Sequence, residues 1–239
     1  MTTQQRAHLD VPASRRVTDV LPAIGAVAGI AGPLLFTVGF IAQGYVRRTE
    51  YSPIAETISA LEAGPIGWIQ QLNFVIFAVL MIIFGTGLRI TLTHRRRIAF
   101  VIFVWWAAGL LAAAIFPLGE TSEGETYDVT GLHQPNGFAF FLSTWAGLAV
   151  LSWCLRADYL WRSISRYALI TSAVLALLFV ILGAFAIPSS APLHPWAGLL
   201  QRIYLAAWFP CLIALAVRLW RLVRGPSRTA PQINVISTG

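Results

Sequence analysis

Long apolar runs dominate the chain and divide it into six segments. Each segment is about 20 residues or longer, enough for an α-helix to cross a hydrocarbon core roughly 30 Å thick. The segments are 21–45, 68–92, 98–117, 135–155, 167–187 and 197–220. Lipid offers backbone groups no hydrogen-bond partners, so each segment should be helical. The pattern predicts an all-α fold, a polytopic membrane protein built as a six-transmembrane-helix bundle.

Three regions follow from this pattern. We predict a cytoplasmic N-terminal tail over 1–20, a six-span membrane domain over 21–222, and a disordered cytoplasmic tail over 223–239, where no apolar period remains. The first apolar run is longer than a signal-peptide core and ends in Arg47 and Arg48, so we interpret it as a retained span. Short polar links predict that the second and third spans form one helical hairpin, and the fourth and fifth another.

The loop after the first span carries a helical pattern of its own. Ser52 followed by Pro53 favours a helix start, and Gly64 followed by Pro65 favours a stop. Between them, Ile54, Ile58 and Leu61 fall on one side, and the polar residues Glu56, Ser59 and Glu62 fall on the other. We therefore predict a short amphipathic helix over 53–63 that lies on the outer membrane surface. Two interpretations stay open, an ordinary connecting helix that shields the bundle end or a lid over a site.

The placement of charge predicts an orientation. Only 11% of residues are charged, against about 25% in soluble domains. All 17 basic residues are Arg, and they gather before the first span, after the even-numbered spans and at the end of the last span. The loop at 118–134 has no Arg and four acids. Because cytoplasmic loops are enriched in basic residues, we predict a plasma-membrane protein with both termini in the cytoplasm.

The basic character also narrows the partners. The net charge is +7, but the Arg runs flank apolar segments, so anionic membrane lipids are expected partners and nucleic acid is not. Cys154 and Cys211 lie in apolar stretches and are interpreted as buried thiols. No pattern points to a cofactor, and the sequence leaves the oligomeric state open.

Polar residues within spans are the best clue to function in a membrane protein. Arg202 lies near the outer end of the last span, beside Gln201. One interpretation is that Arg202 extends towards the lipid headgroups. The other is that it is held inward, which would require an outer carboxylate from Glu56, Asp128 or Glu125.

Other polar candidates lie at the same end of the bundle. Asn73 enters the second span one helical turn after Gln70, where interhelical hydrogen bonding is the ordinary role and ligand contact the alternative. His133 opens the fourth span and His194 lies in the last outer loop. Two His side chains near acids permit a metal site in principle, but HExxH and HxxxH are both absent, so we predict no metal. No nucleophile elbow, Walker loop or dinucleotide fingerprint occurs.

A set of motifs in a fixed order resembles a known family. They are Ser52-Pro53-Ile54-Ala55-Glu56-Thr57-Ile58-Ser59-Ala60-Leu61, Asn73, Phe116-Pro117, Gly131-Leu132-His133 and Gly198-Leu199-Leu200-Gln201-Arg202. Over roughly residues 20–222 the chain resembles the integral membrane family catalogued as domain of unknown function 998. The resemblance implies six spans and no established activity. It also implies a set of characteristic polar positions: Glu56, Ser59, Asn73, Asp128, His133, Gln201 and Arg202.

Three classes of function remain open. The leading hypothesis is a protein that binds a lipid or small amphiphile in a polar pocket open to the outer leaflet. We expect Glu56, Asn73, His133 and Arg202 to line this pocket, with Ser59 and Gln201 as further ligand contacts. The alternative is an intramembrane enzyme acting on a lipid or isoprenoid, with Glu56 or Asp128 as acid or base, His133 as partner and Arg202 binding an anionic group. A transporter or an accessory subunit is the third class.

Overall fold

Six long helices form the protein, as the apolar pattern predicts. The computed structural model describes residues 13–122 and 126–224. The helices are α1 (Ala13–Val46), α2 (Trp68–Thr91), α3 (Arg96–Ile115), α4 (His133–Arg156), α5 (Arg162–Phe185) and α6 (Ala197–Arg224). All six are long and apolar enough to cross a membrane. Helices α1 and α6 extend beyond the predicted domain of 21–222, to Ala13 and Arg224, and the rest of the two predicted tails lies outside the described residues.

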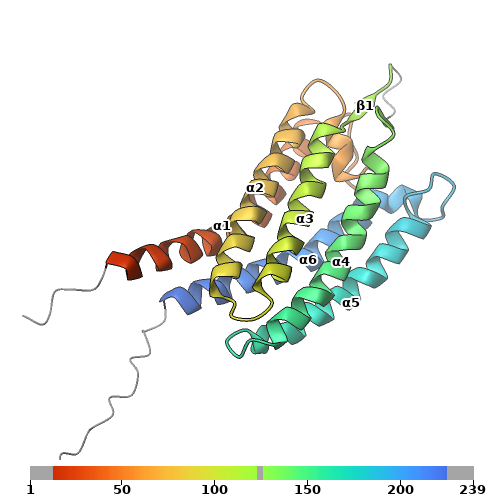
Figure 1. Ribbon diagram of the computed structural model, residues 1–239. Coiled ribbons are helices and arrows are strands. Elements are labelled where there is room, and N and C mark those ends of the chain that lie inside the picture. The colour runs from red at the N-terminus through yellow and green to blue at the C-terminus, as the bar shows by residue number, and fades with distance from the viewer. Residues whose placement is uncertain (1–12, 123–125, 225–239) are drawn as a thin grey trace, which may run out of the picture.

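The helices follow one another around a closed ring. Each helix packs against the next in the sequence, and α6 returns to pack against α1. Figure 1 shows α1 beginning and α6 ending at the same end of the bundle, which also holds the α2–α3 and α4–α5 links. We call this the basic end. The opposite end, built from residues 47–67, 116–122, 126–132 and 186–196, is called the loop end.

The core is aromatic and closely packed. Phe77, Trp106 and Trp208 are almost fully buried, and their rings meet neighbouring rings edge to face. Such contacts are the preferred geometry for aromatic pairs. By contrast, many large apolar side chains point outward, among them Trp105 and Leu177. Outward apolar surface of this kind is what a bundle presents to lipid.

The first loop differs from the predicted amphipathic helix over 53–63. Turns occupy residues 53–55, and only a short 3₁₀ helix, η1 (Ile58–Glu62), follows. This helix does not lie on the surface, because Ile58, Leu61 and Glu62 are all buried. The prediction failed because side chains from other elements hold the loop inward, which no local period reveals.

Two short strands lie above the bundle at the loop end. Strand β1 (Leu118–Glu120) pairs antiparallel with β2 (Thr126–Asp128), with Leu118 opposite Asp128. The sequence analysis predicted only a loop here. Another short 3₁₀ helix, η2 (His194–Trp196), leads into α6. These irregular elements, together with η1, roof the bundle at this end.

Candidate functional site

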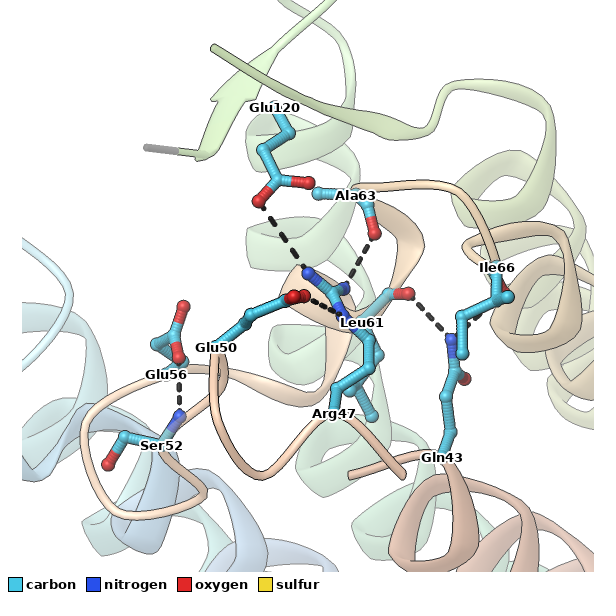
Figure 2. A network of polar contacts seen from close by, with 9 residues as sticks. All are labelled: Gln43, Arg47, Glu50, Ser52, Glu56, Leu61, Ala63, Ile66 and Glu120. Atoms are coloured by element: carbon cyan, nitrogen blue, oxygen red, sulfur yellow. Dashed lines mark hydrogen bonds and ion pairs between the residues drawn. The ribbon is translucent and has the colours of Figure 1, made fainter. Parts of the chain in front are cut away.

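Two side chains at the end of α1 hold the first loop against the bundle. Gln43 donates through its side-chain amide to the carbonyls of Leu61 (2.8 Å) and Ile66 (3.1 Å). Arg47 is 7% exposed, donates to the Ala63 carbonyl at 2.6 Å and pairs with Glu120 of β1 at 3.7 Å. Figure 2 shows these contacts converging on the loop. Arg47 therefore anchors the loop rather than extending into the headgroup region.

Arg202 clamps the same loop from α6. Its guanidinium donates to the carbonyls of Glu56 (3.1 Å) and Gly198 (2.9 Å) and to the Tyr51 hydroxyl. Burial raises the pKa of Tyr51, although the nearby Arg202 charge opposes this, so the hydroxyl stays protonated and donates to the Thr57 carbonyl at 3.0 Å. Of the two interpretations of Arg202, the structure supports the inward-held side chain.

The prediction that Arg202 pairs with an outer carboxylate is wrong for the two candidates that the structure describes, Glu56 and Asp128. Glu56 contributes its backbone carbonyl, and its carboxylate instead accepts from the Ser52 N–H at 2.6 Å. Asp128 makes its hydrogen bonds elsewhere, as described below, and Glu125 lies outside the described residues. Carbonyl groups suffice because a guanidinium offers five N–H donors that can be satisfied by neutral acceptors.

The N-terminus of α6 completes the attachment of the loop. The first N–H groups of a helix lack partners within the helix. Here Gly198 donates to the Ala55 carbonyl (3.2 Å) and Leu199 to the Ile54 carbonyl (2.9 Å). The Gln201 side-chain oxygen accepts from the Ile58 N–H at 2.6 Å. With this many bonds to α6, the loop is a fixed roof, which favours the connecting interpretation over a movable lid.

A cavity of about 330 Å³ lies beneath this roof. Its walls come from the loop, β2, α4, α5 and the start of α6. Polar and titratable groups lie at its loop side, and aromatic and aliphatic side chains from α4 and α5 form the rest. The polar lining residues are Glu56, Thr57, Ser59, Thr126, Tyr127, His133, Gln134, His194 and Gln201.

A second, smaller cavity of about 50 Å³ lies deeper among the aromatic side chains of the core. It shares five wall residues with the larger cavity, which are Ser59, His133, Gly137, Phe141 and Gln201. The two spaces are therefore neighbours separated by a thin wall. Three of the predicted site residues, Ser59, His133 and Gln201, belong to that wall.

His133 has a defined tautomer at this wall. Its Nδ1 atom lies 2.7 Å from the Phe116 carbonyl oxygen at the end of α3. A carbonyl only accepts hydrogen bonds, so Nδ1 must carry the hydrogen. In the neutral ring Nε2 is then an acceptor. The sequence-predicted His133 thus brings an acceptor nitrogen to a cavity wall.

Glu62 lies directly behind His133 and was not among the predicted site residues. Its carboxyl oxygen is 3.3 Å from His133 Nδ1, its side chain is fully buried, and neither oxygen has a well-formed hydrogen bond. Burial, partly opposed by the backbone N–H of Leu118, raises the pKa of Glu62 to about 8. The sequence analysis placed Glu62 on the exposed face of the amphipathic helix, so only the inward fold of η1 identifies it.

Comparison with known proteins now assigns the family. The model of the family described as protein of unknown function (DUF998) matches residues 30–230. The chain belongs to this family. The resemblance seen in the sequence motifs is therefore confirmed. No curated protein and no solved structure matches the chain significantly.

Three of the polar positions that the DUF998 resemblance implies line neither cavity, and these are Asn73, Asp128 and Arg202. Asp128 accepts from the backbone N–H groups of Gln134 (2.9 Å) and Thr130 (3.3 Å) at the start of α4. Burial tends to raise the pKa of Asp128, but these backbone hydrogen bonds outweigh it and hold the pKa below its usual value. Asn73 donates to the Phe36 carbonyl at 3.0 Å, so it ties α2 to α1.

The predicted pocket wall is therefore only partly correct. Glu56 and His133 line the larger cavity, whereas Asn73 and Arg202 line neither cavity because α1 and the loop take up their hydrogen bonds. His194 also lines the larger cavity, with Nδ1 at 3.0 Å from the Ala186 carbonyl. Within residues 13–122 and 126–224, no group of three His, Cys, Asp or Glu side chains could hold a metal ion.

Proposed function

We propose that this DUF998 membrane protein binds one small amphiphile in the larger cavity at the loop end. The observation that carries the proposal is the cavity itself, with polar groups under the roof and apolar walls from α4 and α5. Its volume of about 330 Å³ is at the lower end of the range for ligand sites, roughly 300–1,000 Å³. A headgroup with a single chain suits this size better than a whole two-chain lipid.

The surface of the cavity supports entry from the membrane. Phe138 of α4 and Tyr127 of β2 line it and are 58% and 49% exposed. Apolar surface at a cavity mouth suits a ligand that arrives with its chain in lipid. Because Arg is concentrated at the opposite end, we place the basic end in the cytoplasm and the cavity in the outer leaflet of the plasma membrane.

Two glycines make the proposal testable. Gly137 and Gly183 line the cavity, and a Cβ atom added at either would meet no atom within 4 Å. Gly183→Phe should therefore fill the cavity without disturbing the packing. Leu177→Phe is the matched control, because Leu177 lies on the same helix and is 63% exposed on the lipid face.

The experiment extracts each variant directly into native nanodiscs and identifies bound molecules by mass spectrometry. We expect one amphiphile to be enriched over the surrounding membrane with the wild type and with Leu177→Phe, and to be lost with Gly183→Phe. Equal lipid profiles for all three proteins would overturn the proposal.

Acid–base chemistry on the bound amphiphile is a second candidate function. The observation that favours it is the contact of 3.3 Å between Glu62 and His133 at the cavity wall. In this version Glu62 replaces Glu56 and Asp128 as the carboxyl partner of His133. A bound molecule that accumulates intact with His133→Gln but is converted by the wild type would support catalysis. An identical molecule in both proteins would exclude it for that ligand.

A further inference from the structure

We propose that the larger cavity selects an uncharged amphiphile whose headgroup carries a hydroxyl group, and that His133 Nε2 accepts the proton of that hydroxyl. This inference rests on the proposed function and specifies the chemical class of its ligand. Three observations lead to it: the lining contains no guanidinium, its nearest carboxyl groups are already engaged or neutral, and its wall offers both an acceptor and a donor.

The first observation concerns anionic headgroups. No Arg is among the residues that line the cavity. The two Arg side chains nearest the roof, Arg47 and Arg202, are bound to loop carbonyls, and Arg47 also contacts Glu120. A buried anion without a counter-charge or several donors is strongly disfavoured. A phosphate or carboxylate headgroup would therefore meet only hydroxyl, amide and imidazole groups, with no guanidinium to neutralise its charge.

The second observation concerns cationic headgroups. Among the residues that the structure describes, Glu56 is the only Asp or Glu in the lining, and its carboxylate accepts from the Ser52 N–H at 2.6 Å, as Figure 2 shows. Glu62 lies behind His133 and does not line the cavity. Its burial raises the pKa of the carboxyl to about 8, so it is mostly protonated at neutral pH. An ammonium group in the cavity would have to share the Glu56 carboxylate with the Ser52 N–H.

The third observation concerns hydrogen bonds that remain available. The Phe116 carbonyl fixes the hydrogen of His133 on Nδ1, which leaves Nε2 as an acceptor. The Gln201 oxygen is bound to the Ile58 N–H, which leaves the amide NH₂ of Gln201 as a donor. Both residues belong to the wall shared by the two cavities. A hydroxyl group donates once and accepts as well, so it complements this pair.

The test uses three probes with the same twelve-carbon chain: dodecanol, dodecyl phosphate and dodecylammonium. Each is titrated into protein in lipid nanodiscs, and apparent affinity is taken from the rise in melting temperature with probe concentration. We expect dodecanol to stabilise the wild type and the two charged probes to have no effect beyond that seen with Gly183→Phe. The Gly183→Phe variant reports what each probe does to the bilayer alone.

A conservative variant tests His133 itself. In His133→Asn the side-chain amide still donates to the Phe116 carbonyl, so the end of α3 stays capped, but the Nε2 acceptor is lost. We expect dodecanol affinity to fall about tenfold, as for one lost hydrogen bond. Unchanged dodecanol affinity in this variant would overturn the assignment of His133.

The outcomes separate the two levels of the proposal. A charged probe that stabilises the wild type but not Gly183→Phe would overturn the headgroup inference and leave the proposed function standing. If no probe distinguishes the wild type from Gly183→Phe, and no native amphiphile is enriched, both fail.

Discussion

Two pairs of helical glycines, one near each end of the bundle, have opposite surroundings. At the basic end, a Cβ atom on Gly25 of α1 would lie 2.8 Å from the Cα atom of Gly87 in α2, so the two backbones touch. At the loop end, a Cβ atom on Gly137 or Gly183 would meet nothing within 4 Å. The missing side chains let α1 and α2 pack closely at Gly25 and leave open space at Gly137 of α4 and Gly183 of α5. The open space supports the ligand site proposed in the larger cavity.

Arginine shows the same contrast. At the basic end, Arg95 and Arg224 stack on Trp153 and Trp220, at 3.3 and 3.9 Å from the ring centres. These are contacts near the helix ends. At the loop end, Arg202 binds two carbonyls and the Tyr51 hydroxyl, and these bonds fix the roof of the cavity. Arginine thus contacts aromatic rings near the helix ends at the basic end, whereas at the loop end it holds the roof of the cavity.

The largest expected effect concerns the buried acids. Asp158 at the basic end accepts from the N–H groups of Thr93 (2.8 Å) and Leu160 (3.0 Å), whereas Glu62 at the loop end has no well-formed hydrogen bond and only the Leu118 N–H near it. The pKa of Glu62 is raised from 4.5 to about 8, so the folded protein binds the extra proton between these values. Glu62 therefore makes its full contribution to the unfolding free energy below about pH 4.5, and this contribution is lost as pH rises through about 8.

Glu62→Gln should remove this loss. We expect the variant to exceed the wild type in unfolding free energy by on the order of 4 kcal/mol above pH 8, and the difference to shrink towards pH 4.5. Chemical unfolding in mixed micelles across this pH range measures it. Ser59→Ala, a change in the same 3₁₀ helix without a titrating group, should keep the wild-type pH profile. If the unfolding free energy of the wild type did not decline as pH rises towards 8, the inference that Glu62 is a buried carboxyl without compensating hydrogen bonds would be wrong.

The next effect compares the two ends through matched Arg substitutions. Arg202→Gln removes three hydrogen bonds from the charged group and leaves loop acceptors unpaired, so we expect a loss of about 3 kcal/mol. Arg218→Gln at the basic end removes donors to a single carbonyl, that of Leu160, and should cost about 1 kcal/mol. Thermal unfolding of both variants in one detergent gives the comparison. Equal losses would show that the roof does not depend on its Arg clamp.

The smallest effect tests the glycines. Gly25→Ala forces two helix backbones apart and should destabilise the protein by about 2 kcal/mol. Gly137→Ala adds a methyl group to open space in a helix and should stabilise it by about 0.5–1 kcal/mol. Melting temperatures should therefore move in opposite directions. If both variants shifted the melting temperature in the same direction, the proposed difference between the surroundings of Gly25 and Gly137 would be wrong.

Parts of the site were accessible from the sequence and parts were not. Arg202, Gln201 and His133 are conspicuous because polar side chains are costly in apolar segments, and each has a specific partner in the structure. Glu62 was assigned to a solvent face because a 3.6-residue period was assumed for a segment that folds as a 3₁₀ helix. Asn73 makes the interhelical hydrogen bond that was its ordinary interpretation, because its side chain donates to the Phe36 carbonyl of α1.

The sequence by itself determined the six helices, their order as hairpins and the gathering of polar residues at one end. The physical reason is that lipid requires long apolar runs with internally satisfied backbones, and both requirements are local. Only the tertiary structure decided that the first loop folds inward, that Glu62 lies behind His133 and that a cavity remains beside Gly137 and Gly183. These features depend on contacts between residues far apart in the chain, such as the bond between Ile58 and Gln201, which no local pattern encodes.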